Sequence, residues 1–129
     1  MRDFAAGDTQ MPMTMFERYG GFASISKVVM AFYDRALDSE IIGSYFENTE
    51  MKSQIDHQTK FISALMGGPA SYSDDVLQRV HAGLGIDQQA FDEMAALLAD
   101  TLEDFEFDPD DVDEIMKAIR SRAGIIITR

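Results

Sequence analysis

The stretch that decides the fold is MKSQIDHQTKFISALMGGPASYSDDVLQRVHAGLGI, residues 51–86. It holds both histidines of the chain, His57 and His81, which are 24 residues apart. Between them lies Gly67-Gly68-Pro69, and a regular helix cannot continue through it, because the glycines weaken a helix and the proline ends it. The stretch therefore predicts a helix, a break and a second short helix, with one histidine on each helix.

The first of these helices has an unusual apolar face. Gln58 takes the position that would complete an apolar stripe at helical spacing, whose other members are Met51, Ile55, Ile62 and Leu65. Gln54, His57 and Phe61 lie beside this stripe. A polar side chain that is buried without a hydrogen-bond partner destabilises the fold. We therefore expect Gln58 and His57 to face something polar in a mostly apolar pocket.

The second helix is predicted over about residues 74–82. Ser73 is a suitable N-cap, and acidic residues follow in the first turn, where the helix dipole favours them. Leu77 gives this helix an apolar side, and His81 stands at its end.

Together these residues resemble the group 1 truncated haemoglobins over roughly residues 15–119. The resemblance rests on an ordered set that comprises Gly20-Gly21, Phe32-Tyr33, Phe46, Gln58, Phe61, Gly67-Gly68-Pro69, Tyr72, Val80-His81, and the Gly-x-Gly-Ile run that ends at Ile86. It implies an all-α fold, the truncated globin, in which two antiparallel helix pairs cross over a haem.

Outside the central stretch, helical periodicity continues and no strand pattern competes with it. Short helices are expected over 14–19, capped by Thr14, and within 39–46, and longer ones over 22–37, 87–104 and from Pro109 onward. Asn48 or Thr49 is expected to cap the helix that carries His57. Nine acidic residues between positions 100 and 114 are expected to form a solvated connection, and the run Ile125-Ile126-Ile127 has no role that the sequence reveals.

Length and composition fit one domain over residues 14–129, preceded by a loosely ordered extension over 1–13. The net charge of −12 argues against nucleic acid and anionic membranes as partners. No apolar run approaches the ~18 residues that span a bilayer. The start of the chain does not resemble a signal peptide, and the absence of cysteine fits the cytoplasm.

The resemblance assigns His81 as the axial ligand of haem iron, whereas an isolated histidine at a helix end is more often a capping or surface residue. A subset of the family carries a histidine immediately before the distal glutamine, and there it binds iron as a sixth ligand. Gln54-x-x-His57-Gln58 reproduces that pattern, and the alternative is an exposed His57 on the helix flank. That subset also has a histidine late in the last helix that links covalently to haem. Residues 120–124 have none, so non-covalent haem b is expected.

The pattern of the chain leaves two possibilities for Tyr33, which are a core tyrosine bonded to a nearby carbonyl and a tyrosine that faces a ligand. The resemblance favours the second, and it implies that Tyr33, Gln54 and Gln58 donate hydrogen bonds to oxygen. Residues expected to contact haem are Phe32, Phe46, Phe61, Leu77, Ile86, Phe91 and Met94, with Thr49, Lys52, Tyr72 and Arg79 as candidates for its propionates.

Two functional classes follow from the resemblance. One is a binding protein for oxygen, nitric oxide, carbon monoxide and similar diatomic gases, acting as a monomer or weak dimer. The other is a redox enzyme, such as a nitric oxide dioxygenase, that needs an external electron-donating reductase. A helical interaction module without haem is disfavoured, because it leaves Tyr33, Gln58 and the glycine pattern unexplained.

Overall fold

The computed structural model describes residues 13–70, 73–82 and 84–129, and every regular element in these ranges is helical. The predicted all-α class is therefore confirmed. The elements are α1 (Met15–Arg18), α2 (Gly21–Asp38), the 3₁₀ helix η2 (Gly43–Phe46), α3 (Met51–Leu65), α4 (Asp74–His81), α5 (Gln88–Asp104), α6 (Pro109–Arg120) and α7 (Ala123–Ile126).

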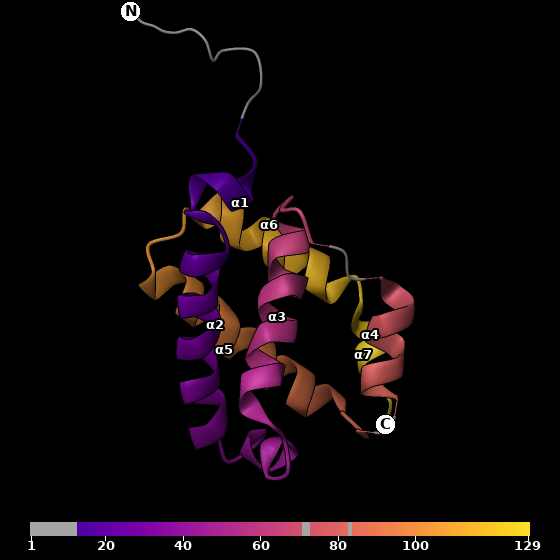
Figure 1. Ribbon diagram of the computed structural model, residues 1–129. Coiled ribbons are helices and arrows are strands. Elements are labelled where there is room, and N and C mark those ends of the chain that lie inside the picture. The colour runs from indigo at the N-terminus through magenta and orange to yellow at the C-terminus, as the bar shows by residue number, and fades with distance from the viewer. Residues whose placement is uncertain (1–12, 71–72, 83) are drawn as a thin grey trace, which may run out of the picture.

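The four long helices form two pairs. Helices α2 and α3 run antiparallel side by side, and α5 and α6 form the second pair behind them (Figure 1). Contacts of α2 with α5 and of α3 with α6 join the two pairs into the predicted 2-on-2 arrangement. Short α4 stands at one side of α3, close to α7 and the C-terminus (Figure 1).

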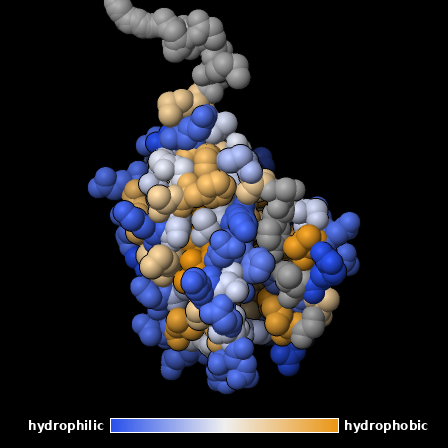
Figure 2. All heavy atoms as spheres, in the orientation of Figure 1, coloured by the Kyte–Doolittle hydropathy of each residue, from blue (hydrophilic) through white to orange (hydrophobic). Residues whose placement is uncertain are grey.

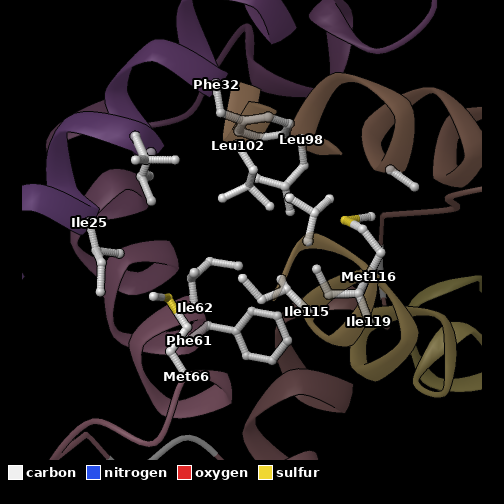
Figure 3. Packing of buried hydrophobic residues seen from close by; sticks show 14 of the residues in the cluster. Ile25, Phe32, Phe61, Ile62, Met66, Leu98, Leu102, Ile115, Met116 and Ile119 are labelled. Atoms are coloured by element: carbon white, nitrogen blue, oxygen red, sulfur yellow. The ribbon is translucent and has the colours of Figure 1, made fainter. Parts of the chain in front are cut away.

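The core lies where the two pairs cross. Phe32 from α2, Phe61 from α3 and Leu102 from α5 point into this space together with Ile115 and Ile119 from α6 (Figure 3). Each of these side chains is at most 6% exposed. Burial of a large apolar side chain is worth about 1.5–3 kcal/mol, so this contact holds the pairs together.

Most predicted helix starts are confirmed by their capping contacts. Thr14, Ser73 and Asp87 each accept a hydrogen bond from a backbone N–H in the first turn that follows, and Pro109 begins α6. The predicted cap of α3 was wrong. Glu50, not Asn48 or Thr49, is the N-cap, and its carboxylate accepts from the backbone N–H groups of Lys52 and Ser53.

The break at Gly67-Gly68 has a steric cause. Gly67 has a φ of +83°, a conformation that other residues rarely adopt. A Cβ on Gly68 would lie 2.6 Å from the Phe16 ring and 2.9 Å from the Ser63 carbonyl oxygen. Helix α3 therefore ends where α1 crosses it, and the backbone N–H of Phe16 bonds to the carbonyl of Met66 at 2.9 Å.

The helix that begins at Pro109 is not the last one, since the isoleucine-rich end forms α7 and buries Ile126. The buried face of α3 also differs from the predicted apolar stripe. Met51, Ile55 and Leu65 are only half-buried, whereas the small polar residues Thr59 and Ser63 are buried.

Hydrophilic side chains cover most of the face in Figure 2, and hydrophobic ones form small separate groups on it. Within the ranges that the structure describes, no helix is long and apolar enough to cross a membrane.

Asp111 departs from the solvated acidic connection that was expected around it. It accepts hydrogen bonds from the Arg18 guanidinium at 3.0 and 3.1 Å and from the Tyr19 hydroxyl at 2.5 Å, and it is 9% exposed. The Tyr19 hydroxyl in turn accepts from the backbone N–H of Asp108, and its ring stacks on Phe107. These contacts attach α1 to α6. The hydrogen bonds from Arg18 and then Tyr19 hold the pKa of Asp111 below its usual value.

We expect Asp111→Asn to destabilise the protein at pH 7 by about 1–2 kcal/mol, because asparagine is uncharged and offers one oxygen where the carboxylate accepts from Arg18 and Tyr19 with two. A carboxylate with a lowered pKa in the folded state stabilises above its unfolded pKa of about 3.9, and the effect disappears as the pH falls through the folded value. The gap between wild type and variant should therefore begin to narrow at about pH 4 and shrink further as the pH falls toward the lowered pKa of Asp111. Urea unfolding across pH 3–7 measures it.

The matched control is Asp110→Asn, since Asp110 is exposed and occupies the same first turn of α6. A gap that is equal for the two variants, or constant down to pH 3, would contradict the role of Asp111.

Candidate functional site

A cavity of about 230 Å³ lies inside the helical frame and is lined by residues from α2, η2 and every later helix. Most of its wall is aliphatic or aromatic. The lining residues are Val29, Phe32, Tyr33, Ile42, Tyr45, Phe46, Thr49, Gln54, Gln58, Phe61, Ile62, Leu77, His81, Leu84, Ile86, Ala90, Phe91, Met94, Leu98, Ile119 and Ile126.

His81 reaches the cavity from the last residue of α4. Its Nδ1 lies 2.8 Å from the carbonyl oxygen of Leu77, one turn earlier in the same helix. A carbonyl oxygen can only accept, so Nδ1 carries the hydrogen in the neutral ring and Nε2 keeps its lone pair. This bond fixes both the tautomer and the ring orientation, which is how proteins prepare a histidine that binds a metal.

A second polar group enters the cavity from α2 and α3. The Gln54 amide donates a hydrogen bond of 2.9 Å to the Tyr33 hydroxyl, and Tyr33 is 3% exposed. A hydroxyl can accept one hydrogen bond and donate another at the same time. Gln58 lines the cavity one turn after Gln54. Three hydrogen-bonding side chains thus gather in a pocket that is otherwise mostly apolar.

The Tyr33 ring is also held by its aromatic neighbours. It meets Phe32 and Phe46 edge to face, with ring centroids 5.0 and 5.3 Å away. Such contacts are worth about 0.5–1.5 kcal/mol beyond their buried area. The position of the Tyr33 hydroxyl is therefore set by packing as well as by Gln54.

The structure brings together most of the residues that the sequence assigned to the site. Twelve of them line the cavity, namely Phe32, Tyr33, Phe46, Thr49, Gln54, Gln58, Phe61, Leu77, His81, Ile86, Phe91 and Met94. Lys52 and Arg79 are exposed and are not among the lining residues, and Tyr72 lies outside the described residues. His57 is exposed on the flank of α3 and does not line the cavity either.

Sequence reasoning missed several lining residues, of which Tyr45 and Ile126 are the most informative. Tyr45 donates to the carbonyl oxygen of Gly85 at 3.3 Å and so connects η2 to the loop after His81. Ile126 arrives from the end of the chain. Neither residue belongs to a motif. The apolar run that contains Ile126 was the one sequence feature that could have indicated its burial.

The lining of the cavity suits an apolar metal cofactor. Aromatic rings from α2, η2, α3 and α5 supply apolar faces, and His81 supplies one imidazole nitrogen with a free lone pair. Haem needs these two features, an apolar enclosure and an axial nitrogen ligand. Tyr33, Gln54 and Gln58 add polar groups that can hydrogen-bond a small molecule beside the metal.

Comparison with known proteins agrees with this assignment. Residues 14–127 match the family model of the bacterial-like globins. A group 1 truncated haemoglobin of Mycolicibacterium paratuberculosis is 34% identical over 117 residues, which are 91% of this chain and 86% of that protein.

Two solved structures are similar as well. The truncated haemoglobin of Tetrahymena pyriformis in its Fe(III) form has a TM-score of 0.82 at 28% identity and covers 91% of this chain and 100% of its own. The 2/2 haemoglobin of a Synechococcus species, which has covalently attached haem, has a TM-score of 0.77 at 26% identity and covers 88% and 98%.

We expect His81→Ala to abolish most haem retention on gel filtration, because it removes the nitrogen that the Leu77 carbonyl orients. The ratio of Soret to protein absorbance measures retention, and circular dichroism shows whether the helices persist. His57→Ala is the matched control and should keep its haem. If the His81 variant holds stoichiometric haem with an unchanged spectrum, His81 is not the ligand.

Proposed function

We propose that this chain, which belongs to the bacterial-like globins, binds oxygen and other diatomic gases reversibly at iron held by His81. Within that family it belongs to the group 1 truncated haemoglobins, and it is therefore a haem-binding globin. The observation that carries the proposal is the 2.8 Å contact between His81 Nδ1 and the Leu77 carbonyl oxygen. This contact places the ring hydrogen on Nδ1 and so leaves Nε2 with the lone pair that can bind iron. Haem would supply the iron at which the gas binds, and His81 would hold it.

The polar side chains of the cavity give the bound gas its partners. Tyr33 and Gln58 donate hydrogen bonds to it, and Gln54 holds the Tyr33 hydroxyl in place through its 2.9 Å bond. Hydrogen-bond donors in the distal pocket of a haem protein decide whether oxygen is retained, released or activated. Donors that are already oriented lose little entropy when the gas arrives.

The apolar wall holds the macrocycle and limits the entry of water. Phe46 and Phe61 line the cavity beside the polar side chains, and Leu77 and Phe91 line it with His81. Phe61, Leu77 and Phe91 are at most 6% exposed, so their rings and methyl groups face the interior and make little contact with solvent. A low dielectric strengthens the hydrogen bonds made there.

We propose that the haem is haem b, held without a covalent bond. The chain has no cysteine, and its two histidines are His57 and His81, neither of them near the C-terminal end. Thr49 lines the cavity and is the best-placed partner for a propionate. Lys52 and Arg79 are long cations at the surface, where they could approach the propionates from outside.

His57 is proposed as a sixth ligand that an external gas displaces. Support comes from its place immediately before Gln58, the pattern found in family members with such a ligand. Because His57 is exposed on the α3 flank, coordination requires α3 to rotate or shift so that this side chain turns inward when haem is present. Apparent affinity for the gas then falls with the fraction of protein in the open state.

The haem attachment has a direct chemical test. Acidified organic solvent should extract the haem completely, leaving a polypeptide whose mass equals that of the sequence alone. The reduced pyridine complex of the extract should have the spectrum of protoporphyrin IX. Haem that stays with the polypeptide, or a polypeptide heavier than its sequence, would disprove non-covalent attachment.

Removing a donor should speed the loss of oxygen. Tyr33→Phe and Gln58→Leu should each raise the oxygen dissociation rate of the ferrous protein by about two- to tenfold, the equivalent of one hydrogen bond. Rapid mixing with a scavenger of oxygen measures the rate. Tyr45→Phe is the matched control, since Tyr45 also lines the cavity but bonds to Gly85.

Equal rates in all four proteins would show that neither Tyr33 nor Gln58 touches the gas. A rate that rises in Tyr45→Phe as much as in Tyr33→Phe would mean that packing, not hydrogen bonding, controls release.

Replacement of His57 tests the sixth ligand. The wild-type ferrous protein should be low-spin without added gas, and His57→Leu should be five-coordinate and high-spin. Carbon monoxide binding should reach a limiting rate in the wild type, at the speed of His57 release, and should stay proportional to concentration in the variant. A binding preference of about 100-fold for the closed state would hide about 2.7 kcal/mol of gas affinity.

The opposite spectrum and the opposite binding kinetics are expected if His57 stays on the exposed flank of α3. The wild-type ferrous spectrum is then already high-spin, and the leucine variant binds carbon monoxide at the same rate. That result would remove His57 from the site and leave His81 and the gas-binding proposal intact.

A further inference from the structure

Helix α4 carries His81 but has little support of its own. It spans two turns, and isolated helices shorter than about 12–15 residues are marginal in water. Among the described helices, α7 is the one whose backbone packs extensively against it. Figure 1 shows α7 and the C-terminus beside α4. The stability of α4 therefore depends on the end of the chain.

The C-terminal segment, residues 122–128, contacts both ends of α4. At the start of the helix, the Arg122 guanidinium lies 3.3 Å from the Asp74 carboxylate. Beyond its end, the backbone N–H of Thr128 donates to the Ile86 carbonyl oxygen at 2.9 Å, and the Thr128 hydroxyl lies 3.5 Å from the carbonyl oxygen of His81. Between these contacts, buried Ile126 lines the cavity with Leu77 and His81.

These contacts differ in strength. Asp74 is 63% exposed, and ion pairs at the surface contribute little. The Thr128 hydroxyl contact is at the limit of hydrogen-bond length. The backbone bond from Thr128 to Ile86 and the burial of Ile126 therefore carry most of the interaction.

We propose that the C-terminal segment positions His81, by fixing α4 and the loop that follows it, and that Thr128 and Ile126 are positioning residues for the iron ligand. The His81 ring is bonded to Leu77 within α4, so a shift of the helix moves the ring with it. The part of this proposal that concerns iron rests on the proposed function, whereas the part that concerns α4 does not.

Thr128→Pro tests the segment by removing the backbone donor to Ile86, together with the Thr128 hydroxyl. Proline has no N–H, and Ile127 already has the extended conformation, φ −79° and ψ 115°, that a residue before proline prefers. Thr128→Val is the matched control, because it keeps the N–H and loses only the hydroxyl. A chain that ends at Ile127 is the second variant and removes the same donor without a proline.

Two measurements are made on the haem-loaded proteins. Amide hydrogen exchange of peptides over residues 74–81 should be about three- to tenfold faster in Thr128→Pro and in the shortened chain than in Thr128→Val. In a His57→Leu background, where the ferrous iron is five-coordinate, the iron–histidine stretching band in resonance Raman spectra should shift or broaden in the same two proteins. Thr128→Val should match its parent in both.

Exchange and a Raman band that are the same in all the proteins would overturn the proposal. Faster exchange with an unchanged band would also overturn it, because α4 would then loosen without moving the ligand. If the chain binds no haem, the proposed function fails, and exchange of residues 74–81 in the same variants still decides whether the segment supports α4.

Discussion

The close approach at Gly68 is the constraint on which the arrangement of the helices depends. No Cβ fits between the Phe16 ring and the Ser63 carbonyl oxygen, so the end of α3 and helix α1 can meet here only through glycine. Once α3 ends, the chain can turn away and place α4 on the other side of the cavity. Gln58 on α3 and His81 on α4 therefore reach one interior from different helices, although both belong to the same short stretch of sequence.

Polar groups in an apolar cavity destabilise the fold unless they are hydrogen-bonded to the protein or to a ligand. His81 and Tyr33 both have partners inside the protein, the Leu77 carbonyl and the Gln54 amide. The bond at His81 Nδ1 leaves the lone pair of Nε2 for a ligand. The site is thus oriented before a ligand enters, and the cost of ordering these side chains is met when the chain folds.

Local signals in the sequence predicted most of the fold. Capping residues such as Ser73 and Asp87 act within one turn, so they can be recognised without the tertiary structure. The buried carboxylate of Asp111 could not be recognised, because its partners Arg18 and Tyr19 lie more than 90 residues away. The burial of Thr59 was missed for another reason. Its hydroxyl donates a hydrogen bond to the carbonyl oxygen of Ile55 within α3, so this polar side chain can be buried on the helix.

The same distinction applies to the site. Family motifs assigned His81, Tyr33 and Gln58 to the site, and all three line the cavity. Ile126 becomes part of the wall only because the chain returns to α4. A short apolar run near a terminus has no period that indicates its partner, so its role depends on tertiary structure.

Helix geometry makes the roles of His57 and Gln58 mutually dependent. Neighbouring residues on an α-helix point about 100° apart, so a helix that turns Gln58 toward the cavity turns His57 away from its centre. The structure has this arrangement, with Gln58 in the wall and His57 exposed. Coordination by His57 therefore requires rotation or displacement of α3, which would move Gln58 at the same time. Exchange between His57 and a gas at iron would then change the hydrogen-bond donors around that gas, so ligation and donor placement would form one linked equilibrium.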